Sequence, residues 1–170
     1  MPCPVIQQDK AFLMKFNNDI TGGFYMATIY CFSSTGNSLY TSKKIAQKIG
    51  AEIKSMLIRN EKCDDDVIGF VFPCYCWGLP NSVEKFLNEL EITNKNAYIF
   101  TVVTYGGTIV GIMGLVENIM KIKGLHVTYG RIIKCVENYN ISFKVNNTPE
   151  MQQKSEKNIN LCAEEISKRI

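Results

Sequence analysis

Four hydroxyl side chains, one amide and a glycine lie together in the stretch Ser33-Ser-Thr-Gly-Asn-Ser38. The apolar run 26–32 precedes this stretch, and the amphipathic segment 38–49 follows it. The pattern predicts a turn from the carboxyl end of a strand into the N-terminus of a helix. Helix N-termini offer free N–H groups and a positive dipole end, and a glycine lets an anion approach the backbone. The stretch is therefore typical of a phosphate-binding loop.

Several known kinds of phosphate loop do not fit this stretch. The Gly-Lys-Ser/Thr ending of nucleoside triphosphatases and the Gly-x-Gly-x-x-Gly spacing of dinucleotide folds are both absent. A phosphatase with Cys31 as nucleophile would need an arginine six residues later, where the chain has Asn37. A response regulator would need an aspartate at the end of the first strand. The alternative that stays open is simple helix capping, for which one hydroxyl suffices.

Two further stretches, 73–80 and 104–107, combine aromatic residues with glycines directly after apolar runs. Aromatic faces stack on planar rings, and glycines allow close backbone approach and peptide reorientation. These stretches predict a site for a flat ring, and the alternative is ordinary packing of the aromatic side chains. The residues concerned are Tyr75, Trp77, Tyr105, Gly78, Gly106 and Gly107.

The elements that must position these stretches alternate between strand and helix. Apolar runs predict strands over residues 26–32, 51–57, 67–72, 97–103 and 126–136, and helical periodicity predicts helices over 38–49, 81–90, 109–120 and from Pro149 onward. Such alternation favours a parallel sheet covered by helices on both faces, with right-handed crossovers. Ligands of these sheets bind outside the carboxyl ends of the strands where the strand order reverses, which is the expected place of residues 33–38.

Composition narrows the class of protein. The 170 residues suffice for one domain, which we expect to span residues 26–170, with residues 1–25 as a loosely ordered N-terminal extension. The net charge of +3 comes from scattered bases, so nucleic acid is not an expected partner. Seven cysteines without a Cys-x-x-Cys pair predict no metal site. No apolar segment approaches the ~20 residues that span a bilayer, and we expect a cytoplasmic protein without a membrane partner.

The stretch Ser33-Ser-Thr-Gly-Asn-Ser38 resembles the Thr/Ser-x-Thr-Gly-x-Thr/Ser phosphate loop of flavodoxins. Residues 73–80 and 104–107 look like the two ring loops in the flavodoxin-like domain of flavodoxin-ferredoxin fusion proteins. The resemblance implies a flavodoxin-like doubly wound α/β fold, with a five-stranded parallel sheet of order 2-1-3-4-5 in three α/β/α layers. It also implies noncovalent FMN, held by Ser33, Ser34, Thr35, Gly36, Asn37, Ser38, Pro73, Cys74, Tyr75, Cys76, Trp77, Gly78, Thr104, Tyr105, Gly106 and Gly107.

The resemblance further implies electron transfer between redox proteins, with a ferredoxin as an example of a partner and with no catalytic residue of the chain's own. The alternatives are an FMN-dependent NAD(P)H or quinone oxidoreductase on the same fold, and an interaction module without flavin. Residues 74–79 and 104–108 contain no Asp or Glu. Together with the net charge of +3, this predicts weak repulsion of a reduced, anionic flavin and faster docking of an acidic partner.

Overall fold

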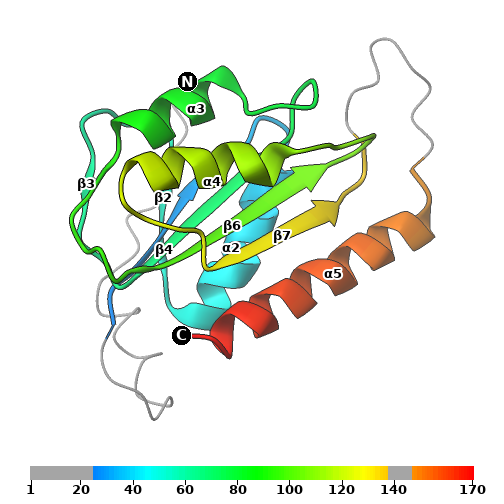
Figure 1. Cartoon of the computed structure of the whole chain (residues 1–170). Helices are drawn as coiled ribbons and strands as arrows, with labels where there is room; N and C mark the ends of the chain where they lie inside the picture. Colours follow the sequence, from blue (N-terminus) through cyan, green and yellow to red (C-terminus); the bar gives the residue numbers. More distant parts are fainter. Residues whose placement is uncertain (1–24, 138–146) are drawn as a thin grey trace, which may run out of the picture.

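A computed structural model describes residues 25–137 and 147–170. Its main sheet has five parallel strands: β1 (Ala27–Cys31), β2 (Glu52–Ser55), β4 (Val67–Pro73), β6 (Tyr98–Tyr105) and β7 (Tyr129–Lys134). They lie in the order β2-β1-β4-β6-β7 (Figure 1). Counted along the chain within this sheet, the order is the predicted 2-1-3-4-5, which is confirmed. The predicted extension 1–25, apart from Tyr25, lies outside the described residues.

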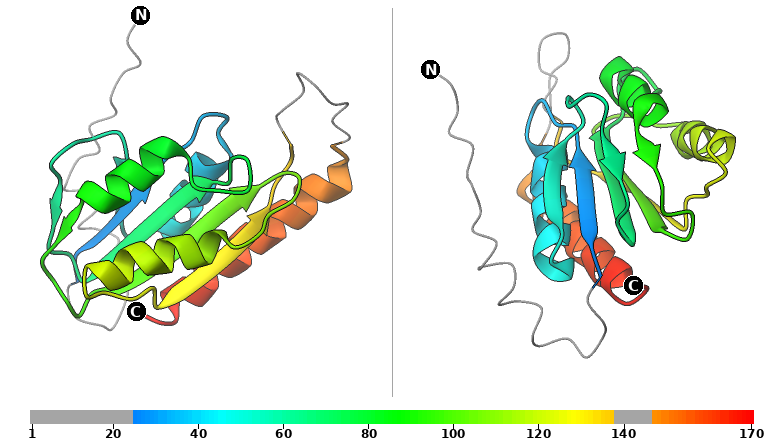
Figure 2. Two further views of the ribbon diagram at one scale, coloured as in Figure 1. Left: turned by 45° about the horizontal axis from the view of Figure 1, so that its top comes forward. Right: turned by 90° about the vertical axis from the view of Figure 1, so that its left-hand side faces the viewer.

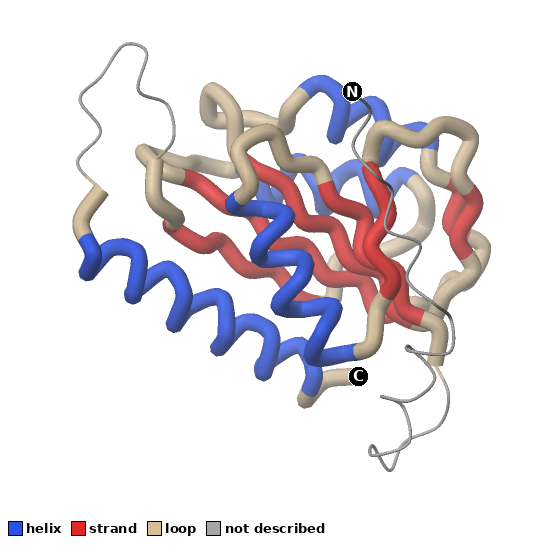
Figure 3. Tube along the Cα trace, turned by 180° about the vertical axis from the view of Figure 1, so that it is seen from behind, coloured by secondary structure: helices blue, strands red, loops and turns tan. Residues whose placement is uncertain are grey.

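Helices cover both faces of the sheet. Helices α3 (Asn81–Glu89) and α4 (Ile112–Ile122) lie on one face, and α2 (Asn37–Ile49) and α5 (Pro149–Ser167) lie on the other. The right-hand view in Figure 2 separates these layers, and Figure 3 shows α2 and α5 in front of the sheet. The predicted α/β/α arrangement is therefore confirmed.

The alternation of side chains along β1 explains why one strand serves two cores. Tyr30 is fully buried and packs on Phe86 of α3, with ring centroids 4.9 Å apart. Ile29 points the other way, into the core formed with Ile45 of α2. Strand β4 is apolar at nearly every position and is buried from Val67 to Phe72, as expected for a central strand covered on both faces.

A glycine in β4 makes room for an aromatic ring in β6. Gly69 is paired with Phe100 in the parallel register. A Cβ atom on Gly69 would lie 2.2 Å from Cζ of the Phe100 ring, a distance that van der Waals contact forbids. The fully buried phenyl ring of Phe100 therefore requires glycine at this position.

Two short strands and several element ends differ from the sequence-based expectations. Strands β3 (Lys62–Cys63) and β5 (Glu91–Ile92) form a separate parallel pair, where the sequence predicted only connections. The strand expected over 126–136 is β7, which is shorter at both ends. The helix expected from residue 109 begins at Ile112, because Gly111 precedes it with a left-handed φ of 69°. Within the described ranges, no helix has both the length and the apolar character needed to cross a membrane.

Candidate functional site

Three loops meet at the carboxyl edge of the sheet, because their strands β1, β4 and β6 are neighbours. The loops are residues 32–36 after β1, 74–80 after β4 and 106–111 after β6. In the parallel register Cys31 is paired with Val71, and Pro73 is paired with Thr104. The N–H of Cys74 also donates to the carbonyl of Thr104, at 2.8 Å. The structure thus brings together the three stretches that the sequence singled out.

The first loop enters α2 without a side-chain cap. Gly36 is the N-cap residue, with a φ of 102° that favours glycine, and no side chain bonds to the helix from this position. The Ser33 hydroxyl instead accepts the Gly36 N–H at 3.1 Å. Within the described residues, the N–H groups of Asn37, Ser38 and Leu39 have no acceptor. The first turn of α2 therefore presents free donors and a positive dipole end, which are the requirements of an anion site.

Two side chains of this loop bind the protein itself. The hydroxyls of Ser38 and Thr104 are 2.8 Å apart, and both residues are buried. The amide nitrogen of Asn37 donates to the carbonyl of Val136 at 2.9 Å. These contacts tie the loop to the end of β6 and to the residues just after β7, so Ser38 and Asn37 fix its position.

The second loop is a tight two-residue turn with an unusual backbone. Tyr75 and Gly78 exchange two backbone hydrogen bonds, of 3.2 and 2.9 Å. The residues between them, Cys76 and Trp77, have φ values of 47° and 62°, the left-handed pair that type I′ turns require. Side chains other than Asn, Asp and Gly rarely adopt this conformation, at a cost of ~1 kcal/mol or more each. From the sequence, Gly78 was the residue expected to allow an unusual backbone conformation in this loop. In the structure, Cys76 and Trp77 adopt the left-handed conformation instead.

The aromatic side chains of the second loop point to different neighbours. The Trp77 side chain is 65% exposed and belongs to no aromatic pair among the described residues. Tyr75 instead lies edge-on to Phe32 of the first loop, and its hydroxyl is hydrogen-bonded to that of Ser34. Burial raises the pKa of the adjacent Cys74 thiol, which opposes formation of a reactive thiolate.

An acidic residue that sequence reasoning missed lies against the third loop. A Cβ atom on Gly106 would be 3.0 Å from both Cβ and Cγ of Glu137, so a larger residue at position 106 would require Glu137 to shift by a few tenths of an ångström. The Oε1 atom of Glu137 is 3.9 Å from the corresponding position on Gly107. Asn147 holds the Glu137 backbone through two hydrogen bonds, of 2.9 and 2.7 Å. The sequence did contain a signal for Glu137, because it follows the end of β7 by three residues. Parallel strands have their carboxyl ends at one edge of the sheet, so a residue just after β7 is expected near the other three loops.

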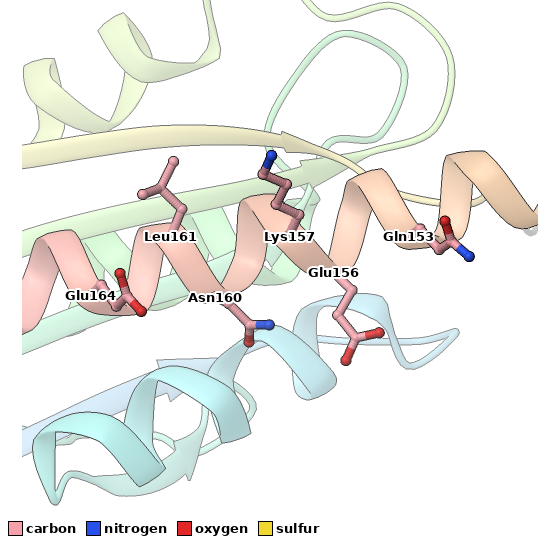
Figure 4. Close-up of a pocket in the computed structure, with 6 residues that line it drawn as sticks. All are labelled: Gln153, Glu156, Lys157, Asn160, Leu161 and Glu164. Carbon is pink, nitrogen blue, oxygen red and sulfur yellow. The ribbon is translucent and has the colours of Figure 1, made fainter.

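Other parts of the described structure offer weaker candidates. A hollow of about 470 Å³ lies on α5, lined by Gln153, Glu156, Lys157, Asn160, Leu161 and Glu164 (Figure 4). It contains none of the predicted site residues, and Glu156 within it is bonded to Tyr40 of α2. Residues 25–137 and 147–170 contain no group of three or more His, Cys, Asp and Glu side chains that could hold a metal ion.

Comparison with known proteins identifies the fold. No protein-family model matches the chain, and no curated protein sequence matches it significantly. Among solved structures, a Fusobacterium nucleatum flavodoxin bound to flavin mononucleotide is 16% identical, with a TM-score of 0.55 over 86% of this chain and 99% of that one. A Streptococcus pneumonia TIGR4 flavodoxin is 13% identical, with a TM-score of 0.53 over 85% of this chain and 99% of that one.

A similar fold also occurs in a protein that is not named a flavodoxin. The Trp repressor binding protein from Bacillus subtilis is 12% identical, with a TM-score of 0.51 over 81% of this chain and 95% of that one. At these identities the likeness is one of fold, and folds of this kind carry many functions. The chain has a flavodoxin-like α/β fold, and its function has to be argued from the three loops.

Proposed function

We propose that this chain binds FMN noncovalently between the three loops and carries electrons between redox proteins. The observation that supports this most is the joining of the loops at one edge of the sheet. Ser38 is bonded to Thr104, and Ser34 is bonded to Tyr75, so the helix N-terminus is fixed beside both aromatic loops. This edge lies where the strand order reverses, between β1 and β4, which is the usual ligand position in such sheets.

The residues present fit the chemistry of FMN. A phosphate would find the free N–H groups at the start of α2 and the Thr35 hydroxyl, which has no partner among the described residues. A planar ring would find the exposed indole of Trp77. A solved flavodoxin of the same fold is bound to flavin mononucleotide. When bound, FMN supplies the redox chemistry, so the chain's residues have to bind it, orient it and control its exposure to water.

We propose the carrier role over the oxidoreductase role, and redox proteins such as a ferredoxin as partners in the cytoplasm. The support is the resemblance of residues 33–38 to the phosphate loop of flavodoxins, and of residues 73–80 and 104–107 to the ring loops in the flavodoxin-like domain of flavodoxin-ferredoxin fusion proteins. An FMN-dependent NAD(P)H or quinone oxidoreductase on the same fold is the alternative to be tested.

Binding is tested through tryptophan fluorescence, because Trp77 is the one tryptophan of the chain. We expect FMN to quench this fluorescence at a stoichiometry of one and to give the protein a flavin absorption spectrum. Unquenched fluorescence and a colourless protein after incubation with FMN would refute the proposal.

The carrier and oxidoreductase roles are then separated by mixing the FMN-loaded protein with NADPH in the absence of any partner. We expect the flavin absorbance to persist for a carrier. Rapid bleaching by NADPH alone would instead establish an oxidoreductase. A chemical reductant such as dithionite serves as the positive control for bleaching.

A further inference from the structure

We propose that Tyr75 and Ser34 form a hydroxyl pair that recognises the phosphate of FMN, with Tyr75 acting through Ser34. Tyr75 then determines the preference for FMN over riboflavin, in place of the ring-stacking role that the sequence predicts for it. This inference rests on the proposed function, and it assigns a specificity-determining role within the same site.

Two side-chain contacts hold Tyr75 against the first loop, and two backbone hydrogen bonds fix its place in the second loop. Its hydroxyl is hydrogen-bonded to the Ser34 hydroxyl, from a residue 41 positions away in the chain. Its ring meets the Phe32 ring edge-on, with centroids 6.3 Å apart and an interplanar angle of 77°. Its backbone is fixed by the two hydrogen bonds with Gly78. The ring is therefore positioned by contacts with the phosphate loop.

The two hydroxyls of the pair carry one more O–H donor than the hydrogen bond between them uses. Each hydroxyl carries one O–H, and the bond between them uses one of the two, whichever residue donates. Within the described part of the chain, neither hydroxyl makes another hydrogen bond. One O–H thus has no partner among the described residues and is exposed to solvent, at the loop whose N–H groups are also without protein acceptors. A phosphate oxygen satisfies that donor.

The direction of the bond follows from the chemistry of the two hydroxyls. Either hydroxyl could donate in this contact, and we assign the donor role to Tyr75 because a phenol is a stronger donor than an aliphatic alcohol; the free hydrogen is then on Ser34. Accepting from Tyr75 polarises the Ser34 hydroxyl and makes it a better donor to an anion. Tyr75 is therefore a positioning residue, and Ser34 makes the contact with the phosphate.

With Tyr75 assigned to the phosphate, the ring-stacking role falls to Trp77. Trp77 is the second central residue of the turn between Tyr75 and Gly78, and it is 65% exposed. A single loop then serves both halves of the cofactor, with Tyr75 assigned to the phosphate and Trp77 to the ring. The two kinds of contact are separable, because riboflavin has the ring and lacks the phosphate.

The test compares FMN and riboflavin affinities of the wild type with those of Tyr75→Phe, Ser34→Ala and the double variant, by quenching of Trp77 fluorescence. We expect Tyr75→Phe to lower FMN affinity about threefold to tenfold, and Ser34→Ala about tenfold or more. Riboflavin affinity should stay unchanged in both. The double variant should bind FMN as Ser34→Ala does, because Tyr75 acts through Ser34.

Tyr40→Phe is the matched control. Tyr40 is also 41% exposed, like Tyr75, and its hydroxyl also bonds one side chain, Glu156, but on α5. This variant should leave both affinities unchanged. The phenylalanine variants keep the ring, so packing on Phe32 persists, and circular dichroism checks that they fold.

Three outcomes would overturn the inference while leaving FMN binding intact: an unchanged FMN affinity in Tyr75→Phe, an equal loss of FMN and riboflavin affinity, or additive losses in the double variant. The second outcome would mean that Tyr75 contacts the flavin ring, and the third would mean that the two hydroxyls act independently on FMN binding. A wild-type protein that binds neither flavin would instead refute the proposed function, and the inference with it.

Discussion

Replacing Thr35 with valine removes one hydroxyl from the loop between β1 and α2 and keeps the shape of the side chain. Thr35 is exposed, and its hydroxyl has no hydrogen-bond partner among the described residues, so folding loses no contact. A phosphate bound at this loop loses a hydrogen bond to a charged group, worth about 1.5–3 kcal/mol. We therefore expect FMN affinity to fall about tenfold to a hundredfold.

The assay follows the fluorescence of Trp77 during titration with FMN and with riboflavin, and thermal unfolding monitors stability. Riboflavin affinity and the unfolding midpoint should match those of the wild type. Thr128→Val is the control, because Thr128 is exposed and precedes β7 at the opposite edge of the sheet. Equal FMN affinity in Thr35→Val and wild type would remove Thr35 from the site, and a parallel loss of riboflavin affinity would show that the phosphate is not involved.

Trp77→Ala should weaken FMN and riboflavin binding alike, as measured by flavin fluorescence, because a stacked aromatic acts on the ring; an effect on FMN alone would contradict stacking. Gly69→Ala should cost about 1–3 kcal/mol in chemical denaturation, because its Cβ would lie 2.2 Å from the Phe100 ring, and wild-type stability would refute that packing. The hydrogen bond from Tyr129 lowers the pKa of Glu165 below 4.5. The stability that this hydrogen bond contributes is present above pH 4.5 and is lost as the pH falls through the lower folded pKa. Glu165→Gln should therefore weaken the pH dependence of the denaturation midpoint below pH 4.5.

The order of the main strands could be predicted from the sequence because burial leaves a local pattern. The continuous apolar run at 67–72 has no polar face, which only a central strand between two helical layers explains. Strands β3 and β5 could not be predicted, because two residues are too few to show a period. Their pairing depends on Lys62 and Glu91, which are separated by 28 intervening residues of the chain, lying side by side.

The site was predictable as three stretches and not as individual roles. Hydroxyl, aromatic and glycine residues after strands are visible in the sequence, and the parallel sheet dictates that the strands end together. The partner of each side chain depends on the tertiary structure. Residues 34 and 38 are both serines of the same short stretch. Ser38 is nevertheless buried against Thr104, whereas Ser34 is exposed and bonded to Tyr75. Only the folded structure separates a buried, anchoring serine from one whose hydroxyl is exposed.

At the proposed flavin site, the local charge and the net charge of the chain have opposite effects on a bound anion. The net charge of +3 and the absence of Asp and Glu in residues 74–79 and 104–108 predict weak repulsion of a reduced, anionic flavin. The structure adds Glu137, whose Oε1 is 3.9 Å from the Cβ position of Gly107. Two like charges about 4 Å apart repel by ~1 kcal/mol in water and by ~4 kcal/mol at an effective dielectric of 20, whereas charges beyond ~10 Å are largely screened. The half-buried carboxylate of Glu137 at the third loop would therefore repel a reduced, anionic flavin bound there, in opposition to the small positive net charge of the chain.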